Sequence, residues 1–590
     1  MRHWRIRGLR KELQRAADAA SVRSSDHQAD ALRLGRYDYF ERREKGENFE
    51  KILRRPRDDA TATREQVVVD PNAEGQGHAL VSVGAVRISR DGSKVAFLKD
   101  ISGEERHELI VRDIATQQLI PMPSLAGVVK GVEWDASGRY LFVATTHSHA
   151  EVLRASQCWL VDLEKQERTC IAEENDPEFM LEVATTSDDA FIRIGRLSLG
   201  ASEHWMVPAN EPSVPPLLMW PRTLNKSYGV DHVTSTDSWL IYCDSIIYSA
   251  SHALGEWKEH FRVPSSCVVS NVELYSDQVV LVGYREAVPW AMRVSLTKDN
   301  AVEELVLPSV TRIELLDRNS PDKLEVSSPK MAPRVVSFSM ERNRPSGDER
   351  IEVFKSPSGV PITYIPGHAV DSPLLLHVYG AYGAISPADF DPFLVPLLDR
   401  GWALAWAHVR GGGMLGLEWH QAGRGNRCIE SSRNLNECAR FLNRPRIALR
   451  ASSAGVLTAA AAMHLPEAAN LYRTALLEVG FLNPSAPELT SLRTFESDEW
   501  GDEEHIRAID PVLTLSRVQH TLPSLFLTAS DADVRVAKSS VARYAQLMAQ
   551  HQPRVPVTLQ LIQGGHFGDQ GSLTWIHDAA EQLDFLIRKT

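Results

Sequence analysis

Cysteine is scarce in this chain and has none of the spacings that build a structural site. Six cysteines occur among 590 residues, and no two of them form a C-x-x-C pair. A disulfide framework or a zinc cluster would need regularly or closely spaced cysteines. We therefore expect a protein of a reducing compartment, the cytoplasm, that needs no metal and no organic cofactor.

Long hydrophobic runs and a surplus of basic residues are also missing. No apolar segment approaches the ~20 residues of a transmembrane helix. Acidic residues number 77 against 65 Lys and Arg, which gives a net charge of −12, whereas a nucleic-acid-binding protein would favour a basic face. The sequence thus argues against a membrane or a nucleic acid as the partner. With 590 residues, the chain exceeds what one hydrophobic core supports, so we expect at least two domains.

The first residues depart from this acidic balance. The segment MRHWRIRGLRK precedes the first acid, Glu12, and the chain as far as Ser25 is rich in Arg, Ala and Ser. We interpret this segment as a basic helix that docks on the body of the protein. The alternative is a mitochondrial or plastid transit peptide, because such peptides are Arg-rich and poor in acids.

Short alternating segments separated by turns occupy the chain from about Leu34 to Pro345. VRISRDGSKVAFLKD (86–100) alternates, turns at Asp91-Gly92 and alternates again, and GVEWDASGRYLFVAT repeats this plan around Ser137-Gly138. The interval between the two turns matches the ~40–45 residues of a four-stranded propeller blade. At that period the region gives a propeller of about seven blades. A stack of β-sandwiches is the alternative.

The pattern changes after about Gly359. PLLLHVYG, GWALAWAHVRGG and LPSLFLTAS have the length of buried strands, and helical stretches such as SSVARYAQLMAQH lie between them. Buried strands that alternate with helices indicate an α/β domain with a mainly parallel sheet. Functional side chains in such a domain are expected in loops at the carboxyl ends of the strands.

The segment IALRASSAGVLTAAAAMH places two serines where a strand turns into a helix. Ser453 is the third residue of Ala451-Ser452-Ser453-Ala454-Gly455, a variant of the G-x-S-x-G nucleophile elbow. Small residues two positions before and after the serine suit that tight turn. Close packing of small residues, without catalysis, is the competing interpretation.

Candidate partners for this serine follow it in the order acid, then histidine. LPSLFLTASDADVRV is a strand that ends in a loop with Asp531 and Asp533, and LQLIQGGHFGD carries His566 in a glycine turn. Separately, the aspartates could cap a helix and the histidine could be a solvated loop residue. All of them at strand ends, in the order of an α/β-hydrolase triad, favour catalysis.

These motifs resemble, in order, the landmarks of the prolyl oligopeptidase family, and within it most of all the oligopeptidase B branch. The landmarks are VYGAYG (378–383), VRGGGMLGLEWHQAGR (409–424), SSAG, DVRV and GGH, and the likeness begins near the start of the propeller at GRYDYFERREKGENFEKILRR. The resemblance implies a serine oligopeptidase that works through an acyl-enzyme. It assigns Ser453 as nucleophile, Asp533 as acid and His566 as base. Tyr379 and the backbone N–H of Ala454 would form the oxyanion hole.

The resemblance also gives a meaning to the acid-rich segment FESDEWGDEE. Composition alone would make it a solvated acidic loop. In the oligopeptidase B branch, two acids that match Glu496 and Asp498 line the pocket for the residue before the cleaved bond. Paired carboxylates bind an Arg guanidinium bidentately and Lys with less defined geometry. The implied substrates are therefore oligopeptides cut after Arg or Lys.

Three residues depart from the family pattern. Ala451 replaces the first glycine of the elbow, Val456 replaces its last glycine, and Met414 stands where a glutamate usually follows GGG. These departures keep two alternatives open. One is prolyl or acylaminoacyl specificity on the same fold, and the other is an impaired pseudoenzyme or interaction scaffold.

The sequence thus predicts an α/β-hydrolase peptidase domain under an all-β, seven-bladed propeller. We expect residues 1–34 to form an N-terminal arm that packs on the peptidase domain, residues 35–345 the propeller lid, and residues 346–590 the catalytic domain. The expected partners are peptide substrates, and the protein is expected to be a monomer or dimer.

Overall fold

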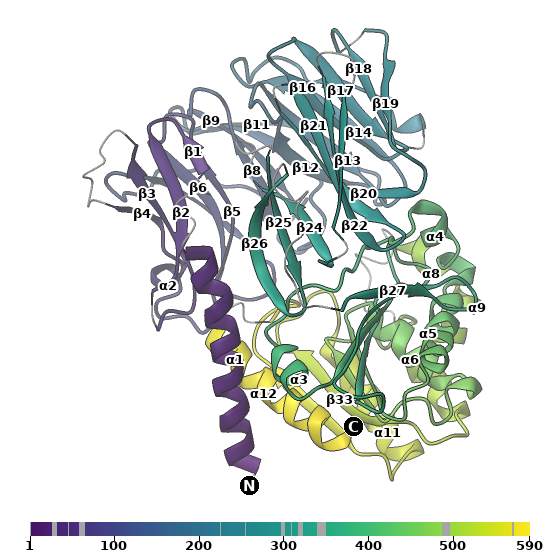
Figure 1. The fold of residues 1–590 in the computed structure, drawn as a ribbon. Helices are drawn as coiled ribbons and strands as arrows, with labels where there is room; N and C mark the ends of the chain where they lie inside the picture. Colours follow the sequence, from purple (N-terminus) through teal and green to yellow (C-terminus); the bar gives the residue numbers. More distant parts are fainter. Residues whose placement is uncertain are drawn as a thin grey trace.

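The chain folds into a ring of small sheets above an α/β body (Figure 1). The computed structural model describes the whole sequence except residues 1, 26–31, 45, 58–64, 225, 254, 276, 297–300, 308, 317–321, 339–349, 487–495 and 569–571. Among the described helices, none combines the length and the apolar character needed to cross a bilayer.

Seven small antiparallel sheets make up the ring in the described part of the chain. Blades 1 and 2 comprise β1 (Leu32–Leu34), β2 (Tyr37–Arg42), β3 (Lys51–Pro56), β4 (Gln66–Val69), β5 (Ser82–Ile88), β6 (Lys94–Asp100) and β7 (Glu108–Asp113), with the short α2 (Pro71–Glu74) between them. Blades 3 and 4 comprise β8 (Val129–Trp134), β9 (Tyr140–Thr145), β10 (Gln157–Asp162), β11 (Glu167–Glu173), β12 (Met180–Thr185), β13 (Phe191–Leu197), β14 (Ser202–Pro208) and β15 (Leu217–Leu218).

The last three blades follow the same meander. They comprise β16 (Tyr228–Val233), β17 (Ser238–Cys243), β18 (Ile246–Ala250), β19 (Lys258–Arg262), β20 (Cys267–Leu274), β21 (Gln278–Arg285), β22 (Val288–Ser295), β23 (Val302–Val306), β24 (Arg312–Leu315), β25 (Lys323–Ser328) and β26 (Met331–Ser337). Gly92 and Gly138 adopt φ of 71° and 68° in the first hairpin turns of blades 2 and 3, a conformation that favours glycine. The prediction of a seven-bladed propeller is confirmed.

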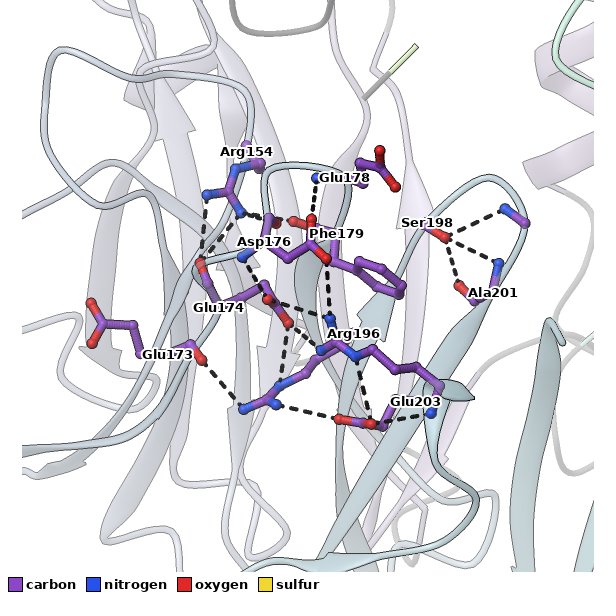
Figure 2. A network of polar contacts seen from close by, with 12 residues as sticks. Arg154, Glu173, Glu174, Asp176, Glu178, Phe179, Arg196, Ser198, Ala201 and Glu203 are labelled. Atoms are coloured by element: carbon purple, nitrogen blue, oxygen red, sulfur yellow. Dashed lines mark hydrogen bonds and ion pairs between the residues drawn. The ribbon is translucent and has the colours of Figure 1, made fainter. Parts of the chain in front are cut away.

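Buried ion pairs join blades 3 and 4 (Figure 2). Glu174 follows the last strand of blade 3 and is 5% exposed. It lies 2.5 Å from Arg222 and 3.6 Å from Arg196, and both arginines also approach the buried Glu203 of β14. Because buried carboxylates are costly without partners, the crossover between these blades is held in one position.

The α/β body is built on one eight-stranded sheet of order β27-β28-β30-β29-β31-β32-β33-β34. Its pairs are antiparallel from β27 to β30 and parallel from β30 to β34, as expected for an α/β-hydrolase domain, so that prediction is confirmed. The strands are β27 (Glu352–Lys355), β28 (Pro361–Ile365), β29 (Leu374–His377), β30 (Ala403–Ala407), β31 (Ile447–Ser452), β32 (Thr474–Glu478), β33 (Ser524–Ser530) and β34 (Val557–Ile562).

Helices cover both faces of this sheet (Figure 1). One face forms a core with α5, α6 and α11, and the other with α1, α3 and α12. The helices are α1 (Arg2–Ser25), α3 (Val395–Asp399), α4 (Leu417–Gln421), α5 (Ile429–Leu442), α6 (Gly455–His464), α8 (Ser497–Trp500), α9 (Glu503–Ile509), α10 (Pro511–Thr514), α11 (Lys538–His551) and α12 (Ser572–Lys589).

The N-terminal helix α1 packs across α12 (Figure 1). It buries a stripe made of Ile6, Leu9, Leu13 and Ala16, at the spacing of one helix face. Charged side chains continue the contact, because Arg5 lies 3.1 Å from Asp584. The basic N-terminal segment thus forms part of the packing of the α/β body.

The propeller touches the α/β body at several points. In blade 2, Glu105 pairs with Arg535 through contacts of 2.5 and 3.0 Å, and Gly103 packs so closely on Gly564 and Gly565 that a Cβ atom there would lie 3.0 Å from the Gly565 nitrogen. In blade 7, Arg312 pairs with Asp389. These contacts place the propeller directly over the loops that follow β33 and β34.

Candidate active site

Ser453 occupies a strained turn between the central strand β31 and helix α6. Its φ is +52°, which is unfavourable for a residue other than glycine. The turn is held because the Ser453 N–H donates to the Glu478 carbonyl at 2.9 Å and the Ser453 carbonyl accepts from Phe481 at 3.1 Å. A Cβ on Gly455 would lie 2.9 Å from the Tyr379 Cα, so glycine is required there. This geometry is that of a nucleophile elbow.

His566 lies between the serine and an aspartate. Its Nε2 is 2.8 Å from Oγ of Ser453, and its Nδ1 is 2.7 Å from Oδ2 of Asp533. The second oxygen of Asp533 accepts the N–H groups of Arg535 and Val536 at 2.8 and 2.9 Å. The arrangement suits a ring that donates from Nδ1 and accepts the serine proton at Nε2.

Asp531, the other acid of the loop after β33, hydrogen-bonds to the loop that carries His566. Its Oδ1 accepts the N–H of Gly564 at 3.0 Å, two residues before His566. The sequence places both aspartates after β33, and the structure separates them by partner. Asp533 meets the imidazole ring, and Asp531 fixes the backbone that carries it.

Two hydrogen-bond donors lie next to the serine. The N–H of Ala454 has no hydrogen-bond partner among the described residues. Tyr379 follows β29, and its pKa is raised by burial and by the nearby charge of Glu496, although a hydrogen bond with Ser453 lowers it. A hydroxyl that keeps its proton and a free amide are the groups an oxyanion hole needs.

Glu496 lies close to this centre, and Asp498 does not. Burial raises the pKa of Glu496 to about 7, against the lowering effects of Tyr382, Trp500 and the charge on Arg535. The side chain of Asp498 is 77% exposed and lies 3.3 Å from Arg424, in a separate surface depression. The structure therefore brings one of the two predicted carboxylates to the site.

A buried pair, Glu499 and His420, supports the chain around Glu496 and Tyr382. The sequence did not predict this pair. Glu499 is 2% exposed; it accepts the Tyr382 N–H at 2.5 Å and lies 2.7 Å from Nε2 of His420. Tyr382 itself adopts a φ of +59°. The available signal was a third acid directly before the tryptophan of DEWG, but composition could not separate it from its exposed neighbours.

The residues that depart from the family pattern have local partners. Val456 is fully buried, and a Cβ on Gly480 would lie 2.7 Å from its Cγ1, so the missing side chain at 480 makes room for the valine. Met414 is buried against Tyr284 and Ala287 of the propeller. Neither departure disturbs the contacts of Ser453.

A cavity of about 690 Å³ opens beside Ser453 and His566. The carboxyl ends of β29 to β32 form its floor, where Arg450 lies 2.7 Å from Asp391 and 2.8 Å from Glu478. Among the described residues, no group of three or more His, Cys, Asp or Glu is arranged to hold a metal ion. The site offers the groups for acyl transfer beside a space large enough for a short peptide.

Comparisons with known proteins match both parts of the chain. The profile "Prolyl oligopeptidase, N-terminal beta-propeller domain" matches residues 12–249, and the profile "Prolyl oligopeptidase family" matches residues 388–590. Protease 2 of Moraxella lacunata is 25% identical over 94% of this chain and 87% of the relative. The prolyl endopeptidase-like protein of Rattus norvegicus is 28% identical over 79% and 69%. The structure of oligopeptidase B from Leishmania major superposes with a TM-score of 0.83 at 20% identity, covering 98% of this chain and 89% of that one.

Proposed function

Because the chain belongs to the prolyl oligopeptidase family of serine peptidases, we propose that it hydrolyses short peptides after Arg or Lys, through an acyl-enzyme on Ser453. The observation that carries this proposal is the hydrogen-bonded series from Ser453 through His566 to Asp533. A serine hydroxyl is a weak nucleophile until a base accepts its proton. The series supplies that base and the carboxylate that orients it.

In the proposed reaction, Oγ of Ser453 attacks the peptide carbonyl while Nε2 of His566 takes its proton. The Ala454 N–H and the Tyr379 hydroxyl stabilise the negative oxygen that forms; loss of one such donor typically costs about 3 kcal/mol. His566 then returns the proton to the leaving amine. Water releases the acyl group by the same steps in reverse order.

The proposed preference for Arg or Lys rests on Glu496. Its carboxyl group lies beside Tyr379, Tyr382 and Trp500, next to the proposed oxyanion donors. A carboxylate that is largely removed from water is stabilised by a cation that hydrogen-bonds to it and neutralises its charge. In our proposal Asp498, paired with Arg424 in a separate surface depression, adds only a more distant negative charge.

An uncharged residue before the cleaved bond is the second candidate. It is favoured by the raised pKa of Glu496 and by the aromatic packing of Trp500 against Tyr382 and Phe481. Such a pocket would suit prolyl or acylaminoacyl substrates. Peptidyl-coumarins that end in Arg, Lys, Pro or acetyl-Ala separate the candidates by kcat/KM, and we expect Arg to be highest.

The mechanism is tested by labelling with a fluorophosphonate probe alongside the Arg-coumarin assay. We expect the wild-type protein to be labelled and active, and Ser453→Ala to lose both properties. Ser452→Ala changes the adjacent serine and is the matched control, which should still be labelled. Retained hydrolysis in Ser453→Ala would refute the proposed nucleophile, and an unlabelled, inactive wild type would favour the pseudoenzyme alternative.

A further inference from the structure

The cavity beside the triad extends away from the pocket that holds Glu496. Its walls include Ser453, His566 and Phe567, and its floor includes His377, Arg450 and Glu478, whereas neither Glu496 nor Asp498 lines it. A histidine that protonates the leaving amine must stand on the leaving side of the scissile bond. The cavity therefore adjoins the half of the peptide that departs.

His377 gives the floor of this cavity an unpaired polar group. Its ring has no hydrogen-bond partner among the described residues, and its Nε2 is buried. The ring stacks on Trp406 at a centroid distance of 4.5 Å. Burial and the charge of Arg450 hold its pKa well below the ordinary value, so the ring is neutral and offers one donor and one acceptor. Because Nε2 has no exposed surface, Nδ1 is the ring nitrogen that can pair with a peptide group in the cavity.

The charges of the floor favour some peptides over others. Arg450 is shared by Asp391 and Glu478 at 2.7 and 2.8 Å, so the three side chains together carry one net negative charge. A third carboxylate, brought by the substrate, would meet like charge in a partly desolvated space, which is unfavourable. An uncharged or basic side chain would not.

We propose that this cavity binds the residues that follow the cleaved bond, and that it accepts uncharged or basic residues there in preference to acidic ones. The inference rests on the proposed function, since it needs a peptide bond cleaved at Ser453. Glu478 and His377 are then determinants of specificity for the departing half of the substrate. The carboxylate of Glu478 discriminates by charge, and the ring of His377 pairs with the peptide backbone.

The test uses a matched set of amidated peptides, acetyl-Ala-Arg-Ala-X-NH₂, in which X is Gln, Lys or Glu. Acetyl-Ala-Arg-aminomethylcoumarin has the same acyl half and no residues after the cleaved bond. For the wild-type protein, we expect kcat/KM to be similar for Gln and Lys and about tenfold lower for Glu. The isosteric change Glu478→Gln should reduce the Gln-to-Glu ratio to near one.

Two variants make this result specific. Glu430→Gln also removes a carboxylate from an arginine, Arg433, but on the surface of α5, and should keep the tenfold ratio. His377→Phe retains a ring against Trp406 and should lower kcat/KM for all three peptides relative to the coumarin substrate.

The outcomes distinguish a failure of this inference from a failure of the proposed function. Cleavage of the coumarin substrate with equal rates for Gln, Lys and Glu peptides would overturn this inference alone, as would an unchanged ratio in Glu478→Gln. Failure to cleave any of the substrates would overturn the proposed function and this inference with it.

Discussion

Glu496 combines two properties that oppose each other, a buried position and a proposed role as an anion. Its pKa of about 7, raised by burial, leaves the carboxyl group neutral below that pH and charged above it. Only the charged form attracts an Arg side chain. We therefore predict that KM for an Arg substrate falls as the pH rises through about 7.

This prediction is checked by measuring KM for Arg-coumarin between pH 5.5 and 9. A substrate with an uncharged residue before the cleaved bond reports every other pH dependence and serves as control. In the Glu496→Gln variant, KM for Arg-coumarin should no longer fall as the pH rises. A KM that stays constant with pH in the wild type would argue against Glu496 as the binding anion.

Glu499 supports the chain beside the Glu496 pocket, although its own carboxylate is buried. Its two oxygens accept the Tyr382 N–H and meet the His420 ring, and Tyr382 is strained at positive φ. We predict that Glu499→Gln loses about 1–3 kcal/mol of transition-state stabilisation for Arg substrates, seen mainly as a higher KM. Glu504→Gln changes an exposed acid of the same segment and should not alter kcat/KM.

The order of the candidate triad could be predicted from sequence, because each candidate follows a segment with the pattern of a strand. The directions of the acids in FESDEWGDEE could not. Glu496, Asp498 and Glu499 lie within a single helical turn at the start of α8, so their side chains diverge, one to the site, one to Arg424 and one into the core. Composition gives the number of acids there and says nothing of which way each points.

At the scale of elements, the elbow depends on a fit between α6 and the chain after β32. Val456 fills the space that a side chain at Gly480 would take. We predict that Gly480→Ala destabilises the α/β body by about 1–3 kcal/mol, as overpacked cores usually do, and lowers its thermal midpoint. The cost should shrink when Val456→Ala is combined with it.

Gly229 provides the control for this experiment. It lies in β16, has ordinary φ, and a Cβ there would meet nothing within 4 Å, so Gly229→Ala should leave the midpoint nearly unchanged. Equal effects of Gly480→Ala with valine or alanine at 456 would contradict the proposed packing.

The propeller was easier to predict from its first blades than from its later ones. Blades 2 and 3 begin with long alternating strands and glycine turns, whereas the outer strand of blade 4, β15, has only two residues, Leu217–Leu218. Outer strands have few neighbours and so carry a weak hydrophobic pattern. The regular spacing of blades is therefore harder to recognise in the sequence where the outermost strand is short.

At the scale of the whole molecule, the link between Glu105 and Arg535 joins the propeller to the loop that carries Asp533. Burial favours the neutral acid, but the hydrogen bond and charge of Arg535 outweigh it, and the pKa of Glu105 lies below its usual value. We predict that Glu105→Gln weakens the contact between the domains and increases the radius of gyration measured by X-ray scattering at physiological salt.

Glu104→Gln is the matched control, because Glu104 lies in the same turn and pairs with the exposed Arg106 of the propeller. The scattering curve of this variant should coincide with that of the wild type. An unchanged radius in Glu105→Gln would mean that other contacts, such as Arg312 with Asp389 in blade 7, hold the domains together without this link.

The pairing of α1 with α12 has a consequence for how the protein folds during its synthesis on the ribosome. Arg5 and Asp584 meet although 579 positions separate them, so α1 emerges long before α12 has been translated. Until then Leu9 and Leu13, both buried in the finished protein, have no docking surface on α12. Contacts so remote in sequence form late, and a nascent chain with exposed apolar residues is prone to aggregate. Translation must therefore reach the codons of α12 before the catalytic half can close around its core.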